Sequence, residues 1–482
     1  MNYPELIYSE KPLPAVMNRQ ILTDLRLDSA FTPAVCETML QKPEKATIAL
    51  RREMFSRLIS DPEAPAKIKK LYSLLDEASG LYSSFTAADC EPAVCFIFVY
   101  LFIAVKRFSD YAMTFSDYGR LFSGFSQTFR RFSEDKRFPK SEEAALQLSE
   151  KLSAELEISF TVTGENATVS KTVEDGIADT LKKCATLLET ESKEKDYSPV
   201  RTYAPIVNAV RTLSPELFSE AKKFTDEYRM MISGEIFKYL EQIGFIDGVL
   251  DFTVNAAKNG IPFSFPEISD NKVIYIKNLY DITLLQKDCR DIIPNDADFD
   301  EDEHFFYLTG ANGGGKTTYL RAVGGAVLMF LAGMPVFCES GKIYIFSAVY
   351  THFPMDERFE GTGRYLNEKN RIDKIMNSQD GNSLILLNET FSTTGEDKAA
   401  VQTKKLATEL ANSGNFGLYI THQHNAEEIL PFLGVIVDES DSNRRTFKIE
   451  KKRLPPKSFA EDILEKYGLT KPALEQKFSD FL

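Results

Sequence analysis

The sequence is poor in cysteine, and its cysteines are not arranged as metal ligands or as a disulfide framework. Six cysteines are spread over 482 residues, and none of them forms a CxxC pair. Structural zinc sites and small disulfide-rich domains both depend on closely spaced cysteines. The sequence therefore disfavours both classes, and we expect the protein to act in a reducing cytoplasm.

Long apolar runs are scarce as well. The most apolar stretch, Ala93–Val105, has about a dozen residues, whereas a helix needs about 20 to span a bilayer. Residues 1–18 contain Glu5, Glu10 and three prolines without an apolar centre, unlike a signal peptide. We therefore expect no signal peptide, no membrane-spanning segment and no membrane partner.

A surplus of basic residues is also absent. The formal net charge is −14, and a protein that coats nucleic acid needs lysines and arginines gathered on one surface. Any contact with DNA must therefore be local. A few basic pairs occur, but such pairs usually belong to solvated surfaces and we assign no site to them: Arg130-Arg131, Lys182-Lys183 and Arg444-Arg445.

The pattern of apolar residues differs between the two halves of the chain. The length of 482 residues also exceeds the size at which a single hydrophobic core stops growing. From about Ile21 to Asp251 the apolar residues follow helical spacing, except at Ile158–Ser170, where β-branched residues around a turn predict a hairpin. After about Ile261 short apolar strands alternate with helical segments, which is typical of an α/β nucleotide-binding domain. We predict a mainly α-helical region over residues 1–260 and an α/β P-loop NTPase domain over residues 261–482. The predicted strands include Val273–Ile276, Tyr307–Thr309, Ile343–Phe346, Leu384–Leu387 and Leu418–Ile420.

A phosphate-binding motif lies between the apolar strand Phe305–Leu308 and the helical run Tyr319–Leu331. Residues 310–317 read GANGGGKT and match G-x-x-x-x-G-K-[ST]. In such a loop backbone N–H groups converge on phosphate oxygens, a lysine reaches the β- and γ-phosphates, and a hydroxyl binds Mg²⁺. The predicted ATP-binding residues are Gly310, Asn312, Gly313, Gly314, Gly315, Lys316, Thr317 and Thr318.

A second motif ends the strand that precedes Asn388-Glu389. We predict Glu389 as the general base that activates water, and Thr317, Asn388 and Glu389 as the Mg²⁺ ligands. An aspartate is usual where Asn388 stands, and the neutral amide keeps an oxygen but loses the charge that favours Mg²⁺. We therefore expect slow hydrolysis.

A third strand, Leu418–Ile420, runs into Thr421-His422. An imidazole at the carboxyl edge of such a sheet is placed to sense a γ-phosphate. We predict His422 as a catalytic residue and leave His424 undecided.

These motifs together resemble the ATPase domain of the MutS family of DNA mismatch-repair proteins. The family's P-loop typically reads TGPNMGGKST, and Thr309–Thr318 reads TGANGGGKTT here. Gly361–Glu368 is similar to the family signature G-x-S-T-F-M-x-E, which approaches the partner subunit's nucleotide, although Gly363 replaces the serine. Three further segments are similar to family motifs: Ile293–Asp296 to V-P-N-D, Thr421-His422 to T-H, and Ser458–Leu469 to the segment that closes the domain.

The resemblance implies a function and a set of partners. It implies an ATP- and Mg²⁺-dependent homodimer of the ABC/MutS type, whose helical core, lever and clamp regions hold duplex or branched DNA with low sequence specificity during repair or recombination. Ile21–Asp28 looks like the start of the core-and-lever region. That start leaves no room for the family's N-terminal mismatch-reading domain, and no F-x-E wedge stands in a suitable position. We therefore do not expect a mismatch reader.

Two other ATPase classes fit less well, and one alternative stays open. An ABC transporter-type ATPase should carry an LSGGQ-like segment shortly before the second motif, and Ile372–Gly381 contains none. A P-loop kinase needs an arginine-rich lid, which we cannot locate. The open alternative is a nucleotide-gated DNA- or protein-binding module with little or no turnover, because Asn388 and Gly363 both depart from the family pattern.

Overall fold

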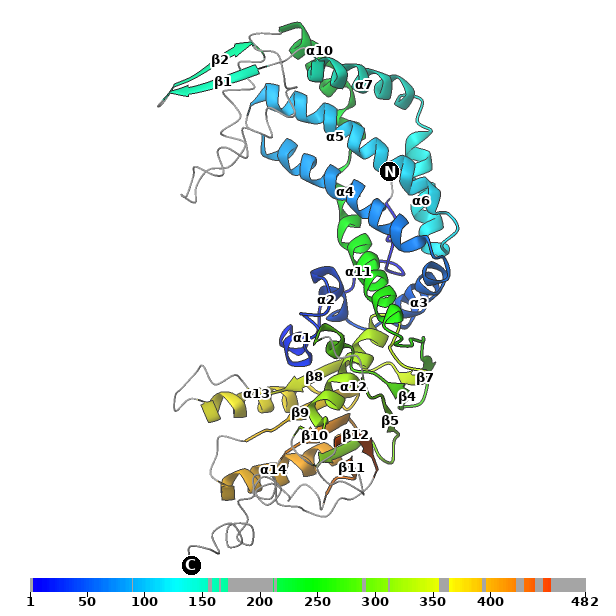
Figure 1. Ribbon diagram of the computed structural model, residues 1–482, viewed down its shortest axis with the longest axis vertical. Coiled ribbons are helices and arrows are strands. Elements are labelled where there is room, and N and C mark those ends of the chain that lie inside the picture. The colour runs from blue at the N-terminus through cyan, green and yellow to red at the C-terminus, as the bar shows by residue number, and fades with distance from the viewer. Residues whose placement is uncertain are drawn as a thin grey trace, which may run out of the picture. The chain divides into compact units, whose positions relative to one another are not determined.

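The computed structural model describes residues 3–88, 90–154, 158–163, 166–171, 211, 215–287, 292–310, 313–354, 364–391, 396–421, 429–437 and 445–451. These residues form a mainly helical first part followed by mixed helices and strands, which confirms the predicted mixed α/β class (Figure 1). The chain folds into two compact units. Unit 1 consists of Met1–Ile7 and Arg57–Asp247, and unit 2 consists of Tyr8–Ser56 and Gly248–Leu482.

The two compact units alternate along the chain, so their division differs from a single boundary after residue 260. Tyr8–Ser56 and the residues from Gly248 onward fold with the α/β part of the chain. Both changes of unit in the middle of the chain occur inside helices, α3 (Lys45–Ser60) and α11 (Tyr239–Lys258). The functional division into residues 1–260 and 261–482 stays a prediction.

Unit 1 is a helical bundle around α5 (Glu91–Ala112). Helix α5 packs against α4 (Ala64–Ala87), α6 (Arg120–Ser133), α7 (Phe138–Ala154) and α10 (Pro215–Tyr228), and Figure 1 shows α4 and α5 side by side. Phenylalanines fill the interior, among them the buried Phe98, Phe102, Phe108, Phe125 and Phe129. Short 3₁₀ helices complete the unit: η1 (Met113–Phe115), η2 (Arg229–Met231) and η3 (Gly234–Lys238).

Helix α5 is longer than the apolar run Ala93–Val105. It has 22 residues, because the helix continues past the apolar stretch through Lys106, Arg107 and Asp110. Together with η1 it is long and apolar enough, by length and composition, to cross a membrane, and it alone among the described helices meets that test. About 67% of its most apolar window is buried inside the protein, as expected for the central helix of a bundle. The absence of a membrane-spanning segment stays a prediction.

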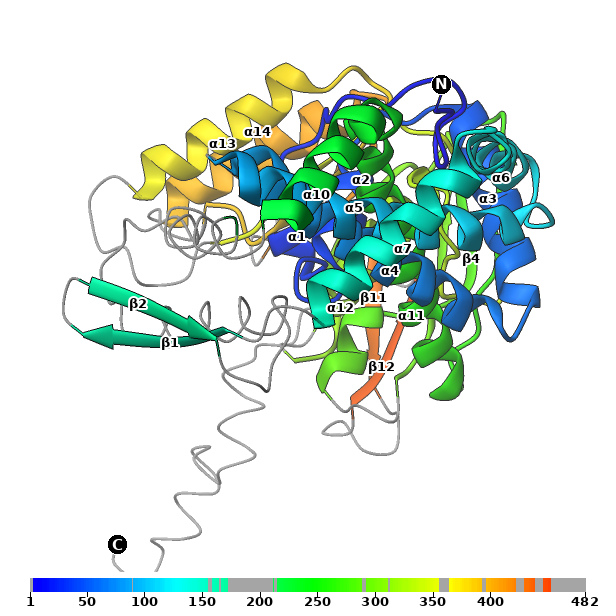
Figure 2. The same cartoon turned by 90° about the horizontal axis from the view of Figure 1, so that it is seen from above.

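The predicted hairpin is confirmed. Strand β1 (Ile158–Thr163) pairs antiparallel with β2 (Asn166–Lys171), and the register places Thr163 opposite Asn166 at the turn. Figure 2 shows the two strands as a narrow ribbon. The hairpin thus interrupts the helical region where the β-branched residues predicted it.

Unit 2 contains two sheets. The larger has the order β12-β11-β6-β10-β9-β8, in which all strands except β12 run parallel. Its strands are β6 (Phe305–Thr309), β8 (Ala348–His352), β9 (Ser383–Asn388), β10 (Phe416–Ile420), β11 (Phe432–Val437) and β12 (Arg445–Glu450). The smaller sheet has the order β3-β7-β4-β5, from β3 (Glu267–Ser269), β4 (Ile274–Leu279), β5 (Asn295–Phe299) and β7 (Ser340–Tyr344). Strand β7 begins three residues before the predicted strand Ile343–Phe346 and ends two residues before its predicted end.

Helices cover both faces of the larger sheet. Helices α13 (Arg364–Ser378) and α14 (Glu396–Ala411) pack on one face, through residues such as Ile372 and Leu406, and lie alongside each other in Figure 2. Helix α12 (Lys316–Leu331) lies on the other, where Gly324 is so close to Leu386 and Leu25 that a Cβ atom would lie 2.5 Å and 2.9 Å from them. The sheet is therefore buried on both sides, as parallel sheets are. The remaining helices of unit 2 are α1 (Gln20–Leu25), α2 (Pro33–Met39) and η4 (Ile282–Lys287).

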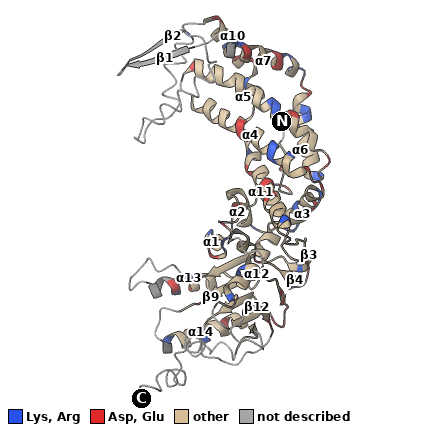
Figure 3. Ribbon diagram, in the orientation of Figure 1, with Lys and Arg blue, Asp and Glu red and all other residues tan. Residues whose placement is uncertain are grey.

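Charged residues are dispersed over the described elements. Figure 3 shows lysines and arginines interspersed with acidic and uncharged residues, without a continuous basic stretch among the described residues. Arg130 and Arg131 at the end of α6 are exposed, as expected for solvated surface. Lys182-Lys183 and Arg444 lie outside the described residues.

Candidate nucleotide-binding site

The loop after β6 has the backbone that a phosphate-binding loop requires. Gly310 has a φ of 127°, and a Cβ atom there would lie 2.8 Å from Val435 on β11. Gly315 has a φ of 98° and forms the N-cap of α12. Both positions favour glycine because a side chain at such φ values is strained, and at Gly310 it would also clash. Because the first N–H groups of a helix have no intrahelical acceptor, the N-terminal end of α12 at this loop favours an anion.

Lys316 is held within this loop. Its side chain is buried, and Nζ donates a hydrogen bond to the Gly310 carbonyl oxygen at 2.6 Å. A buried ammonium group is costly unless polar groups satisfy it. The loop thus holds a positive charge beside the N-terminal end of α12, where anions are favoured.

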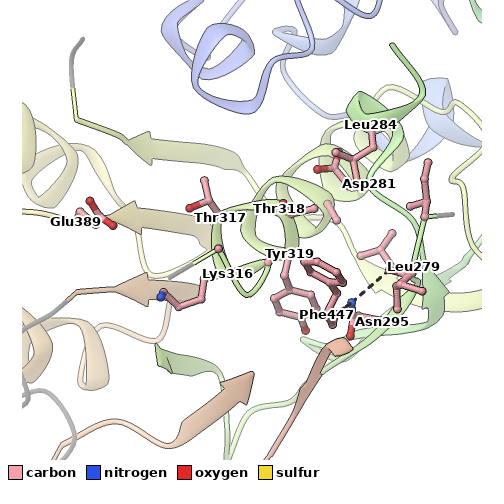
Figure 4. Close-up of a pocket in the computed structure, with 15 residues that line it drawn as sticks. Leu279, Asp281, Leu284, Asn295, Lys316, Thr317, Thr318, Tyr319, Glu389 and Phe447 are labelled. Atoms are coloured by element: carbon pink, nitrogen blue, oxygen red, sulfur yellow. Dashed lines mark hydrogen bonds between the residues drawn. The ribbon is translucent and has the colours of Figure 1, made fainter. Parts of the chain in front are cut away.

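A pocket of about 500 Å³ opens beside the loop. Figure 4 shows Lys316 and Thr317 on the side of the loop that faces the strand ending at Glu389, with Asn295 and Phe447 on the other side. One part of the lining is polar or comes from the loop: Gly313, Gly315, Lys316, Thr317, Thr318, Glu389, Asn295 and Asp281. The other part is largely apolar: Leu279, Leu284, Ile292, Ile293, Tyr319, Ala322 and Phe447. A ligand with a charged end and a flat apolar end fits this division.

Strand β9 brings Asn388 and Glu389 to the carboxyl edge of the sheet. Asn388 is buried at 7% exposure, and within the described part of the chain its Oδ1 has no hydrogen-bond partner. Buried acceptors without partners are rare. Glu389 has a φ of 49° and donates its N–H to the Ile420 carbonyl oxygen at 2.7 Å. Its side chain lines the pocket.

The apolar rim of the pocket depends on Asn295. The Asn295 Nδ2 group donates to the Phe447 carbonyl oxygen at 3.0 Å, and its Oδ1 accepts from the Ile449 N–H at 2.8 Å. Phe447 has a φ of 57° and its side chain is 43% exposed. One amide therefore holds the backbone that directly follows the strained Phe447, whose ring lines the pocket.

Helix α1 is fastened to the elements around the site through one buried carboxylate. Asp24 accepts hydrogen bonds from Thr351 on β8 at 2.7 Å and from Arg371 on α13 at 3.3 Å. Its backbone carbonyl accepts from Arg321 on α12 at 3.0 Å. The Asp24 side chain is 5% exposed, so its charge is compensated by these donors.

The structure brings most of the predicted site residues together. Gly313, Gly315, Lys316, Thr317, Thr318 and Glu389 line one pocket, Gly310 begins its loop, and Asn388 ends β9, which β10 separates from β6 in the sheet. Gly314 is buried in the same loop. Asn312, His422 and His424 lie outside the described residues, as does Gly363 of the signature-like segment.

The sequence did not single out several residues of this pocket. Asn295 lies in the segment similar to V-P-N-D, and this was a signal for its importance although not for its contacts. Asp281 and Leu284 follow β4, and Phe447 lies on β12. No local pattern marks these three, because only the folded chain brings them to the loop.

Comparison with known proteins agrees with this geometry. Residues 306–438, which run from β6 to just after β11, match the family model of MutS domain V. The chain carries a MutS domain V. This confirms the resemblance inferred from its motifs.

The relatives of this chain are longer proteins. Endonuclease MutS2 of Streptococcus thermophilus is 31% identical over 137 residues, which are 28% of this chain and 17% of that protein. DNA mismatch repair protein MutS of Methanococcoides burtonii is 29% identical over 244 residues, 46% of this chain and 27% of that protein. The MutS of Fervidobacterium nodosum is 26% identical over 201 residues, 42% of this chain and 23% of that protein. The matched part of this chain therefore spans less than a third of each relative.

Proposed function

We propose that this MutS-family protein binds ATP with Mg²⁺ in the pocket beside α12 and hydrolyses it slowly. ATP binding would close a homodimer that holds duplex or branched DNA during repair or recombination, without reading mismatches. One observation carries the proposal: Lys316, Thr317 and Glu389 line the same pocket at the carboxyl edge of a parallel sheet. This is where open α/β sheets bind ligands.

The two parts of the pocket suit the two ends of ATP. The N–H groups at the start of α12 and the Lys316 ammonium group attract the phosphates. The apolar part, with the exposed ring of Phe447, offers a surface on which the flat base can stack. ATP affinity would thus come from both ends of the molecule.

The donor set fits Mg²⁺. Thr317 offers a hydroxyl, Glu389 a carboxylate, and Asn388 a buried amide oxygen without a partner among the described residues. Mg²⁺ prefers such oxygen ligands and keeps several of its waters. When bound, the ion would neutralise phosphate charge, and an amide in place of a carboxylate would bind it more weakly.

Glu389 is the group that takes a proton from the attacking water. Its carboxylate lines the pocket from the end of β9, two strands away from β6, so it lies across from the phosphate-binding residues. A positioned carboxylate that accepts this proton contributes about 10²–10⁴-fold to a rate. His422 remains our proposal for the residue that senses the γ-phosphate.

The DNA and dimer parts of the proposal rest on family membership. Two of the relatives carry the name DNA mismatch repair protein MutS and another the name Endonuclease MutS2. With a net charge of −14 and dispersed basic residues, DNA contact would be local and sensitive to salt. We further propose that the protein acts in the cytoplasm and has no membrane partner.

The proposal is tested by ATP hydrolysis of the pure protein, with and without Mg²⁺, duplex DNA and branched DNA. We expect slow hydrolysis that requires Mg²⁺ and that DNA changes by severalfold, together with an ATP-dependent shift from monomer to dimer in light scattering. ATP hydrolysis at the same rate with and without DNA would contradict the proposed ATP-dependent dimer that holds DNA. A protein that stays monomeric with ATP would contradict it as well.

One observation favours a second candidate, a nucleotide-gated DNA- or protein-binding module with little or no turnover. The neutral amide of Asn388 stands where an aspartate is usual, and its oxygen is buried without a partner among the described residues. Tight ATP binding and dimerisation without measurable hydrolysis in the same experiment would favour this module.

A further inference from the structure

The turn that carries Glu389 is strained. Glu389 has a φ of 49° and Phe391 a φ of 62°, so two residues with side chains lie in the left-handed region within three positions. Such residues are uncommon, and they persist where surrounding contacts hold them. The direction of the Glu389 carboxylate therefore depends on whatever fixes this turn.

Two of the contacts that fix the turn come from its own sheet and its covering helix. The Glu389 N–H donates to the Ile420 carbonyl oxygen on β10 at 2.7 Å. Thr390 is buried, and its hydroxyl is hydrogen-bonded to the Tyr419 hydroxyl, which also donates to Thr403 on α14 at 3.4 Å. These contacts belong to elements packed in one core, and they hold one side of the turn.

The third contact comes from α13. A side-chain oxygen of Glu368, Oε1, accepts a hydrogen bond from the Phe391 N–H at 2.8 Å. The carboxylate also lies close enough to Tyr419 to raise the pKa of that hydroxyl further, after the larger effect of burial. A charged acceptor makes a stronger hydrogen bond to a backbone N–H than a neutral one does. Glu368 thus supports the turn from α13, in addition to the contacts that the turn makes with β10.

Helix α13 connects this contact to other parts of unit 2. Arg371 lies three positions after Glu368, on a neighbouring position of the same helix surface. It donates to the Phe353 carbonyl oxygen at 3.3 Å and forms the ion pair with Asp24 at 3.3 Å. Glu368 is also the last residue of the segment similar to the family signature. A shift of α13 would therefore move the support of the turn without touching the loop that holds the phosphates.

We propose that Glu368 is a positioning residue for Glu389, which aims the catalytic carboxylate by holding the Phe391 N–H and makes ATP turnover depend on the position of α13. The inference rests on the proposed function, since it takes Glu389 as the general base. Proton transfer needs hydrogen-bond geometry between base and water. A turn that relaxes would misplace the base while ATP binding stays intact.

The first test compares three variants in steady-state ATP hydrolysis and in ATP binding. Glu368→Ala removes the acceptor and should lower kcat by about 10- to 100-fold with ATP affinity unchanged within about twofold. Glu368→Gln keeps an acceptor oxygen and should stay within about threefold of wild type. Asp373→Ala, at an exposed carboxylate on the same helix, is the matched control and should behave as wild type.

The outcomes that overturn the inference are specific. An unchanged kcat in Glu368→Ala, an equal loss of ATP affinity and kcat, or a Gln variant as impaired as the Ala variant would each do so. A double variant adds a second check. In a Glu389→Gln background Glu368→Ala should cost almost nothing more, because both act through one group, and a full additional loss would contradict a positioning role.

A readout that needs no turnover separates this inference from the proposed function. Amide deuterium exchange of the peptide containing Phe391 should be faster in Glu368→Ala and near wild type in Glu368→Gln. Equal exchange in all three proteins would overturn the inference, whatever their activity. If the wild type hydrolyses no ATP, the proposed function fails, and the exchange measurement still decides whether Glu368 holds the turn.

Discussion

The two units of this protein are stabilised in different ways. The interior of unit 1 is a set of phenylalanine rings, and its buried hydroxyls, such as those of Ser109, Ser126 and Thr225, donate to carbonyl oxygens of helices. Unit 2 contains every described non-glycine residue with a positive φ: Arg26, Asn278, Glu389, Phe391 and Phe447. It also holds the buried Asn388 Oδ1 and His352 Nδ1, which lack partners among the described residues.

The two units thus differ in whether apolar packing or strained and polar groups distinguish their interiors. Backbone strain and unpartnered polar atoms cost free energy and persist where a function uses them. Glu389 and Phe447 line the pocket, and Phe391 lies two residues from Glu389. We conclude that unit 1 is determined by apolar burial, whereas unit 2 keeps local strain around a binding site.

The largest expected effect falls on the packing of unit 1. The Phe125 ring lies 4.9 Å from the rings of both Phe129 and Tyr239, so Phe125→Ala should lower the free energy of unfolding by about 3–5 kcal/mol. ATP affinity, measured by calorimetry while the variant is folded, should not change. The matched control is Phe447→Ala in unit 2, which should weaken ATP binding and leave stability within about 1 kcal/mol. The opposite pattern would break the comparison.

The next effect is a pH dependence of unit 2. Burial, together with the nearby Arg371, lowers the pKa of His352 to about 4. The unfolded chain takes up this proton near pH 6.5, whereas the folded chain stays neutral until about pH 4, so stability falls as the pH drops between these values. The loss should reach about 3 kcal/mol in wild type beyond that of His352→Gln, measured by denaturant unfolding. Parallel pH profiles of the two proteins would refute the assignment.

Lys316→Ala tests the role of the Lys316 positive charge in unit 2. The ammonium group is held at the N-terminal end of α12, and its loss should weaken ATP binding about 100-fold, as expected for a charged hydrogen-bonding group of about 3 kcal/mol. Binding is measured with a fluorescent ATP analogue. Lys374→Ala, an exposed lysine on α13, is the control. An unchanged affinity in Lys316→Ala would exclude the loop as the phosphate site.

The smallest expected effect sharpens the account of Asn388. Asn388→Asp places a carboxylate among the proposed Mg²⁺ ligands, and the Mg²⁺ concentration for half-maximal ATP hydrolysis should fall by about tenfold. The measurement is a Mg²⁺ titration of hydrolysis in both proteins. A lower turnover at every Mg²⁺ concentration would show instead that the amide is required as it stands.

The sequence predicted those parts of the molecule that depend on neighbouring residues. The glycines around Lys316, the strand that ends in Asn388-Glu389 and the hairpin at Ile158–Ser170 each follow from local backbone requirements, and the structure has them where the patterns predicted. Helix α5 extends beyond the apolar run Ala93–Val105, and Lys106, which ends that run, pairs with Asp110 one turn later. A paired charge can continue a helix that hydropathy alone would end.

Contacts between distant segments were beyond the sequence. Nothing near Arg51 signals that its buried guanidinium donates to the Ala332 carbonyl oxygen, a contact that belongs to the packing of Tyr8–Ser56 into unit 2. The same holds for Phe447, which reaches the pocket from β12, and for Glu368, whose contact with Phe391 spans 23 residues. These features arise from tertiary packing and leave no periodic pattern.

The most direct test of the account is a single-turnover measurement of ATP hydrolysis with excess protein and Mg²⁺, comparing wild type with Glu389→Gln. The account predicts that both proteins bind ATP with similar affinity and that the variant hydrolyses it about 10²–10⁴-fold more slowly. Equal hydrolysis rates in the two proteins would contradict the central claim that Glu389 is the catalytic base of an ATP site beside α12.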